Sequence, residues 1–205
     1  MKVKTLLFTL FIACFINTSN AQTEVPDGAV RIIKDSFTKC DLGAPVTGSL
    51  YGELSSDIAV MVGCKGSEKN NYSSLQRILI LTKSSDGKYF IASKTDEFSN
   101  NGIYDFSLAI KKNSLFIHIS VPGSQTAFVY DYQFKKIGKD LILIGMETQS
   151  YYHGDEPQNE STEDFHVSSN YLTGVVLDSR HKAGKNRKAN LKRIKIQEFY
   201  PGVGA

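Results

Sequence analysis

Two histidines and an aspartate in the C-terminal third of the chain have side chains of the kind that bind zinc. His153 and Asp155 lie within the polar stretch 151–164, and His166 follows it. Zinc sites use imidazole nitrogens and carboxylate oxygens, and residues two apart share one face of an extended segment. The alternative is a solvated loop, because a stretch rich in Gln, Asn and Ser offers no evident partners to fix the ligand geometry.

The same region carries enough carboxylates for an acid–base hydrolase. Glycoside hydrolysis uses two of them, one as general acid and the other as base or nucleophile. The candidates are Glu147, Asp155, Glu156, Glu160, Glu163 and Asp164. No G-x-S-x-G, H-E-x-x-H or phosphate-binding glycine motif accompanies them. The sequence therefore assigns no catalytic residue, and a solvated acidic loop is the competing interpretation.

Charge is distributed unevenly along the chain. Residues 180–195 carry eight Lys and Arg and no acid, although the whole chain has a formal charge of only +3. Three interpretations fit: a solvated hairpin end, a partner for the acidic loop, or a contact for an anionic protein face, lipid headgroup or cell-wall polymer. A nucleic-acid partner is not expected, because no aromatic residues that could stack on nucleobases are interleaved with these Lys and Arg residues. The residues expected to contact a partner are Asp155, Glu156, Arg180, Lys182, Lys185, Arg187 and Lys188.

The N-terminal residues have the pattern of a secretory signal peptide spanning residues 1–21. Two lysines precede the apolar run LLFTLFIACFI, and small residues end the segment. This run is shorter than the roughly 20 residues of a membrane-spanning helix. We therefore expect cleavage, a periplasmic or secreted protein, and no transmembrane segment after signal removal. The alternative is a lipoprotein in which Cys14 is lipidated.

Cys40 and Cys64 are the two cysteines that follow the signal segment. An exported pair is expected to form a disulfide, because the compartments outside the cytoplasm are oxidising. Closing a loop of this length stabilises a fold by roughly 3 to 4 kcal/mol in the chain-entropy model. Two unpaired buried thiols are the alternative.

Short runs of β-branched and aromatic residues between turn residues predict an all-β fold. Residues 58–62 form a continuous apolar run, which indicates a strand buried on both faces. Three successive hairpins are predicted around residues 85–87, 112–114 and 135–139, the first from its Asp-Gly signal. Their strands are expected at residues 76–83, 88–93, 104–111, 115–121, 127–134 and 140–146.

After the hairpins, the pattern predicts an exposed acidic loop at 151–164 and a strand at 170–177. A basic turn at 183–190 and a closing strand at 191–199 follow. The mature chain, residues 22–205, is thus expected to be a single β-rich domain. Its predicted architecture is an antiparallel meander, arranged as a sandwich or as irregular propeller-like sheets, with one disulfide.

A series of short motifs follows in order between residues 25 and 177. They are Val25-Pro-Asp-Gly28, Gly52-Glu-Leu54, Asp57-Ile-Ala-Val-Met-Val62, Arg77-Ile-Leu-Ile-Leu81, Asp86-Gly-Lys-Tyr89, Gly123-Ser124, Tyr130-Asp-Tyr-Gln-Phe134, Leu143-Ile-Gly145 and Ser169-Asn-Tyr-Leu-Thr-Gly174. This order resembles exported bacterial proteins related to degenerate FG-GAP or VCBS-type β-repeat domains, which are mostly uncharacterised. The resemblance implies an exported β fold and carries over no catalytic residue.

Better-formed members of that family have an aspartate-rich loop of the D-x-N-x-D-G type, which suits calcium. The corresponding stretch here offers Glu53 and Asp57 with two serines between them. Calcium takes about six to eight oxygen ligands, so the resemblance does not carry calcium binding over to this chain.

Two functions from different classes follow from these observations. The first is an exported, non-catalytic binding protein of the bacterial envelope that acts on a protein partner, of which a periplasmic inhibitor or immunity-type protein is the sharper form. The first function needs no cofactor. The alternative is a metal- or carboxylate-dependent hydrolase of an envelope polymer, centred on residues 153–166.

Overall fold

A computed structural model describes residues 25–52, 55–65, 74–99, 102–103, 105–152, 164–180 and 186–204. The predicted signal segment and Cys14 lie outside these ranges, so export stays a prediction. The elements are α1 (Asp27–Ser36), β1 (Cys40–Leu42), β2 (Val46–Gly48), β3 (Asp57–Lys65), β4 (Ser74–Lys83), β5 (Tyr89–Lys94), β6 (Phe98–Ser99), β7 (Asp105–Lys111), β8 (Ser114–Val121), β9 (Thr126–Ile137), β10 (Asp140–Tyr152), β11 (Phe165–Asn170), β12 (Val175–Asp178), β13 (Arg187–Lys188) and the 3-10 helix η3 (Ile196–Glu198).

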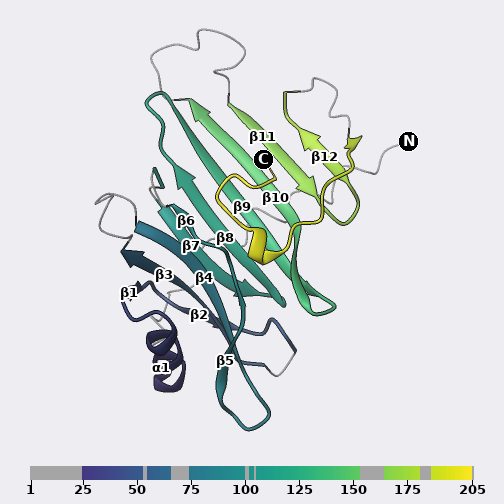
Figure 1. Cartoon of the computed structure of the whole chain (residues 1–205). Helices are drawn as coiled ribbons and strands as arrows, with labels where there is room; N and C mark the ends of the chain where they lie inside the picture. The colour runs from purple at the N-terminus through teal and green to yellow at the C-terminus, as the bar shows by residue number, and fades with distance from the viewer. Residues whose placement is uncertain are drawn as a thin grey trace.

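The strands form two antiparallel sheets (Figure 1). The first sheet has the order β1-β3-β4-β5, with β2 also paired to β3 and β6 to β4. The second sheet has seven strands in the order β13-β12-β11-β10-β9-β8-β7, so each strand lies beside its neighbour in sequence. This uninterrupted meander confirms the predicted all-β antiparallel fold. Within the described residues, neither α1 nor η3 is long and apolar enough to cross a membrane.

The first sheet is the middle layer of the molecule, because apolar side chains cover both of its faces. Ile58 and Val60 of β3 pack with Ala29 and Ile33 of α1. On the opposite face, Ala59 and the β4 residues Ile78 and Ile80 join the core shared with the second sheet. Since successive strand residues point to opposite faces, burial on both sides requires an unbroken apolar run. The prediction for residues 58–62 is confirmed.

The three predicted hairpins are present, and their turns explain their positions. β4 and β5 are joined through Gly87, whose φ is +80°. Lys112 and Asn113, both with positive φ, connect β7 and β8, as a two-residue hairpin turn requires. β9 and β10 pair through Ile137 and Asp140, so most of the predicted loop 135–139 belongs to β9.

One predicted strand is wrong in its first half and another is wrong altogether. Residues 170–177 contain a turn, because the Asn170 side-chain oxygen accepts hydrogen bonds from the backbone N–H groups of Leu172 and Thr173. Gly174 then adopts a φ of +70° and β12 begins. Residues 191–199 are not a closing strand either. This segment makes a single β-bridge, between Lys195 and Ile142, and then turns inward as η3.

Helix α1 is not among the predicted elements. It begins after Pro26, whose carbonyl accepts hydrogen bonds from the N–H groups of Ala29 and Val30. Ala29 and Ile33 are four residues apart, so both face the first sheet. At ten residues the helix is marginal on its own, and its stability comes from this packing.

Asp57 is fully buried at the start of β3 and holds the preceding loop in place. Its Oδ2 accepts hydrogen bonds from the backbone N–H groups of Leu50 (2.6 Å) and Tyr51 (2.9 Å) and from the Ser55 hydroxyl (2.6 Å). Glu53, the second residue considered for calcium, lies outside the described residues. The Asp57 carboxylate therefore orders the loop between β2 and β3 through charge-assisted hydrogen bonds.

Replacing Asp57 by asparagine is expected to lower the free energy of unfolding by about 1.5 kcal/mol. The amide keeps one acceptor oxygen but removes the charge from three hydrogen bonds and places a buried NH₂ group where Oδ1 has no hydrogen-bond partner in the described residues. Urea unfolding measures the change, with Asp41→Asn on the exposed side of β1 as the control. Equal effects of the two substitutions would contradict the assigned role.

Candidate functional site

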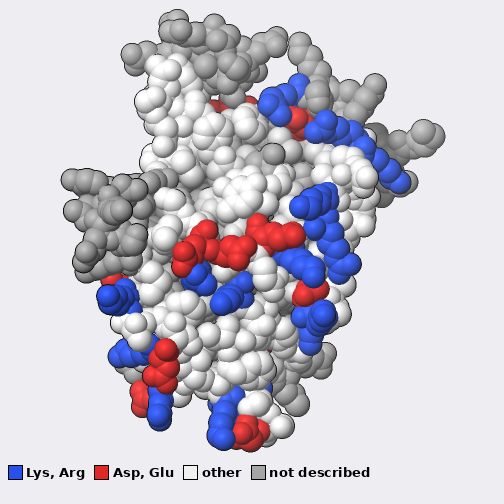
Figure 2. Space-filling model, viewed as in Figure 1, with Lys and Arg blue, Asp and Glu red and all other residues white. Residues whose placement is uncertain are grey.

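Four exposed bases gather where the second sheet ends and the chain turns back across it. Arg187 and Lys188 form β13, and Lys192 and Arg193 follow in the C-terminal segment, which we define as residues 189–204. We call these four side chains the basic band. Figure 2 shows Lys and Arg gathered along the side of the molecule where β12 and the C-terminal segment lie in Figure 1.

The backbone around the basic band is held at several points. The N–H of Ala189 donates to the carbonyl of Gly174, and the N–H of Leu143 donates to the carbonyl of Ile194. Ile194 and Ile196 are buried in the shared core. Because these anchors fix the backbone on either side of Lys192 and Arg193, their side chains are directed to solvent.

The basic residues next to the basic band, Arg180 and Lys195, each have a carboxylate partner. Arg180, a predicted contact residue, donates from Nε and Nη2 to the two carboxylate oxygens of Asp178 (2.9 and 2.8 Å). This hydrogen bonding raises the pKa of Arg180. Lys195 lies 3.1 Å from the Asp140 carboxylate. Within the described residues, no ion pair neutralises the four side chains of the basic band.

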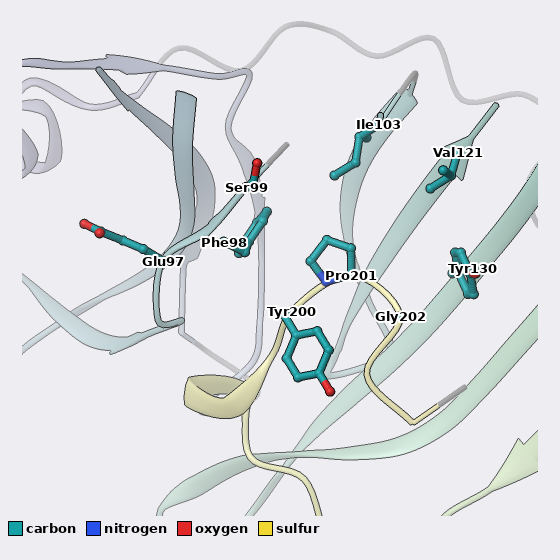
Figure 3. A pocket seen from close by; sticks show the side chains of 9 residues that line it. All are labelled: Glu97, Phe98, Ser99, Ile103, Val121, Tyr130, Tyr200, Pro201 and Gly202. Atoms are coloured by element: carbon teal, nitrogen blue, oxygen red, sulfur yellow. The ribbon is translucent and has the colours of Figure 1, made fainter. Parts of the chain in front are cut away.

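A hollow of about 600 Å³ opens between the two sheets, next to the C-terminal segment. Figure 3 shows that side chains from β6, β9 and the C-terminal segment surround it. Its carboxylate, Glu97, is already paired with Arg77, so the lining suits apolar groups rather than proton transfer. None of the residues predicted as a site lines this hollow. The lining consists of Glu97, Phe98, Ser99, Ile103, Val121, Tyr130, Tyr200, Pro201 and Gly202.

Tyr132 holds Gly202, one of the lining residues of the hollow, in place. Its hydroxyl oxygen accepts a hydrogen bond from the N–H of Gly202 at 2.7 Å. Burial raises the pKa of Tyr132 well above its ordinary value, so the hydroxyl stays protonated at any physiological pH. The loop that carries Tyr200 and Gly202 is therefore tied to β9.

The predicted zinc and hydrolase residues are only partly brought together. Asp164 and His166 both line a second hollow of about 300 Å³, but Asp164 Oδ1 accepts the N–H of Tyr152 at 2.6 Å. His166 Nε2 instead lies 3.4 Å from Glu147 Oε2. In the ranges that the structure describes, no three His, Cys, Asp or Glu side chains converge as a metal site requires. The predicted residues outside those ranges are His153, Asp155, Glu156, Glu160, Glu163, Lys182 and Lys185.

One polar arrangement is not predicted by the sequence. His118 Nδ1 lies 2.8 Å from Asp131 Oδ1, across the β8–β9 pair. Strand alternation places His118 on the face opposite to Ile117 and Ile119, but it does not reveal which residue of the next strand lies opposite. Only the register of the β8–β9 hairpin shows that this partner is Asp131.

Searches against protein-family models, curated proteins and solved structures found no match to this chain.

Proposed function

We propose that the mature chain is an exported, non-catalytic binding protein whose basic band docks onto an acidic face of a protein partner. The observation that carries this proposal is the gathering of four exposed bases on an anchored backbone (Figure 2), with no ion-pair partner among the described residues. Such a patch attracts an oppositely charged surface and steers the encounter. Arg187 and Lys188, expected from the sequence to contact a partner, belong to it, whereas Arg180 is engaged with Asp178.

A periplasmic inhibitor or immunity-type protein is the specific form that we propose. A rigid domain that blocks another protein needs a preformed surface more than a reactive group, because preorganisation lowers the cost of binding. The anchoring of the band through Ala189 and Ile194 supports this form. The relation to FG-GAP and VCBS-type repeat proteins belongs to the same proposal and rests on the order of the sequence motifs alone.

Reversing charge in the basic band is expected to weaken partner capture at least tenfold, which corresponds to about 1.4 kcal/mol. The test immobilises residues 22–205, either unchanged or as Arg187→Glu/Lys188→Glu/Lys192→Glu/Arg193→Glu, and captures partners from the strain of origin at low and high salt. A partner retained at low salt and released at high salt is the expected result, because salt screens exposed charges.

A matched control separates the position of the charges from their number. Lys34→Glu/Lys39→Glu/Lys83→Glu/Lys94→Glu makes the same change in net charge at exposed positions on α1, beside it and on the first sheet. This variant should capture the partner as the unchanged protein does. Equal losses in both variants would contradict docking through the basic band, and so would full retention by the band variant.

A further inference from the structure

Five ionisable side chains lie in a row on the outward face of the second sheet. Asp105, His118, Asp131, Glu147 and His166 come from five neighbouring strands, β7 to β11. They alternate along their strands with residues such as Phe106, Ile117 and Tyr132, which belong to the shared core or pack against it. We call this set the acid–histidine row. It shares no residue with the basic band.

The strand register places the members of the row beside one another. His118 is directly opposite Asp131, and Asp131 is directly opposite Glu147. His166 pairs in register with Gln149, two residues along β10 from Glu147, and reaches diagonally to within 3.4 Å of its carboxylate. Asp105 lies diagonally from His118, because its register partner on β8 is Ser120. The hairpins thus fix these neighbours.

The centre of the row is a pair of like charges. Asp131 and Glu147 face each other across β9 and β10, the two longest strands of the sheet. Like charges directly opposite each other destabilise a strand pair. Each carboxylate has a histidine on its far side, at 2.8 Å from Asp131 and at 3.4 Å from Glu147. A protonated imidazole beside Asp131 can offset the repulsion, whereas a neutral imidazole carries no charge.

We propose that the acid–histidine row is a proton-operated clamp on the second sheet, in which protonation of His118 offsets the repulsion between Asp131 and Glu147. A protonated His118 places a positive charge 2.8 Å from the Asp131 carboxylate, which faces Glu147. Acidification therefore strengthens the pairing of β8 to β10 and makes the outward face less negative.

The electrostatics of His118 agree with this direction. Its hydrogen bond to Asp131 raises the pKa of His118 above the ordinary 6.5, partial burial opposes the rise, and the negative charges of Asp131 and Asp105 add to it. A histidine whose folded pKa is raised contributes stability that is fully present below pH 6.5. That contribution is lost as the pH rises through the folded pKa.

Asp164 is the nearest further charge, because it lies two residues before His166 and lines the same hollow, where its Oδ1 accepts the N–H of Tyr152. The lysines of these strands lie farther away. Lys111 is six residues along β7 from Asp105, and Lys135 is four residues along β9 from Asp131. At about 3.4 Å per residue these separations are roughly 20 and 14 Å, beyond the distance over which exposed charges interact strongly in physiological salt. In the described part of these five strands, no lysine lies as near to the paired carboxylates as His118 and His166 do.

The test is urea unfolding between pH 5.5 and 8.5 of the unchanged protein and of His118→Gln. Glutamine keeps hydrogen-bonding capacity without titrating, and His153, His166 and His181 are present in both proteins, so their effects cancel in the difference. We expect the midpoint of the unchanged protein, relative to that of the variant, to fall as the pH rises through the window. Parallel pH profiles would overturn the proposal.

A second variant gives a result that a purely structural role does not predict. Glu147→Gln removes one of the two facing charges, so it should raise the midpoint at pH 8.5 and raise it less, or lower it, at pH 5.5. A loss of equal size at both pH values overturns the clamp. If the histidine variant does not fold, nuclear magnetic resonance titration of the unchanged protein decides, and a folded pKa of His118 at or below 6.5 counts against the proposal.

Discussion

Replacing Phe199 by alanine is expected to lower the free energy of unfolding by about 4 kcal/mol. Phe199 is 1% exposed and lies in the core between the two sheets. Its ring meets Phe98, Tyr132 and Phe134 edge-on, with centroids 5.7, 5.1 and 5.8 Å away. Truncation removes these contacts and leaves a cavity at a point where β6, β9 and the C-terminal segment meet.

Urea unfolding followed by far-ultraviolet circular dichroism measures this loss. The neighbouring Tyr200 is the matched control, because its side chain is 56% exposed and Tyr200→Ala should change stability by no more than about 0.5 kcal/mol. A loss below 1 kcal/mol for Phe199→Ala would show that the two sheets are stable without this aromatic contact.

Replacing both Cys40 and Cys64 by alanine is expected to lower the free energy of unfolding by about 3 kcal/mol. The two residues form a disulfide and lie directly opposite each other on β1 and β3. They are separated by 24 positions, and the loop between them contains β2 and the turn that Asp57 holds. Without the bond this loop gains conformational freedom in the unfolded chain, which favours unfolding.

Reductant provides the matching control for the disulfide. Dithiothreitol should lower the unfolding midpoint of the unchanged protein towards that of the alanine variant and should not change the variant. If the two proteins unfold at the same urea concentration under oxidising conditions, the disulfide contributes little to stability. The pairing of β1 with β3 would then hold this part of the sheet without the bond.

The elements that the sequence predicts correctly are those whose signals are local. The hairpin around Lys112 and Asn113 is an example, since its turn residues and its alternating strands lie within about 20 positions. The unbroken apolar run of β3 is another, because burial on both faces leaves no polar position within it. Both patterns follow from strand geometry and need no information about distant residues.

The incorrect predictions concern segments whose conformation depends on distant partners. Residues 191–199 have the apolar content of a strand, yet Ile194, Ile196 and Phe199 bury themselves between the sheets instead of pairing along a whole edge. Helix α1 is equally dependent on context, because the apolar face of the first sheet is what stabilises it. In both cases tertiary packing decides the conformation.

The two candidate sites also differ in whether a local sequence signal reveals them. The basic band is visible in the sequence, because eight bases without an acid form a local signal. The acid–histidine row is not, since His118 and His166 are 48 positions apart and meet carboxylates only through the register of three hairpins. No fixed spacing in the sequence identifies such an arrangement.

The position of the C-terminal segment also has a consequence for how the protein is made. Ile194, Phe199 and Val203 complete a core whose first members, Leu50 and Ala59, are synthesised some 140 residues earlier. The two sheets therefore cannot close over their full core until the ribosome has added these late residues. A chain held open in this way keeps its apolar strands accessible to chaperones during synthesis.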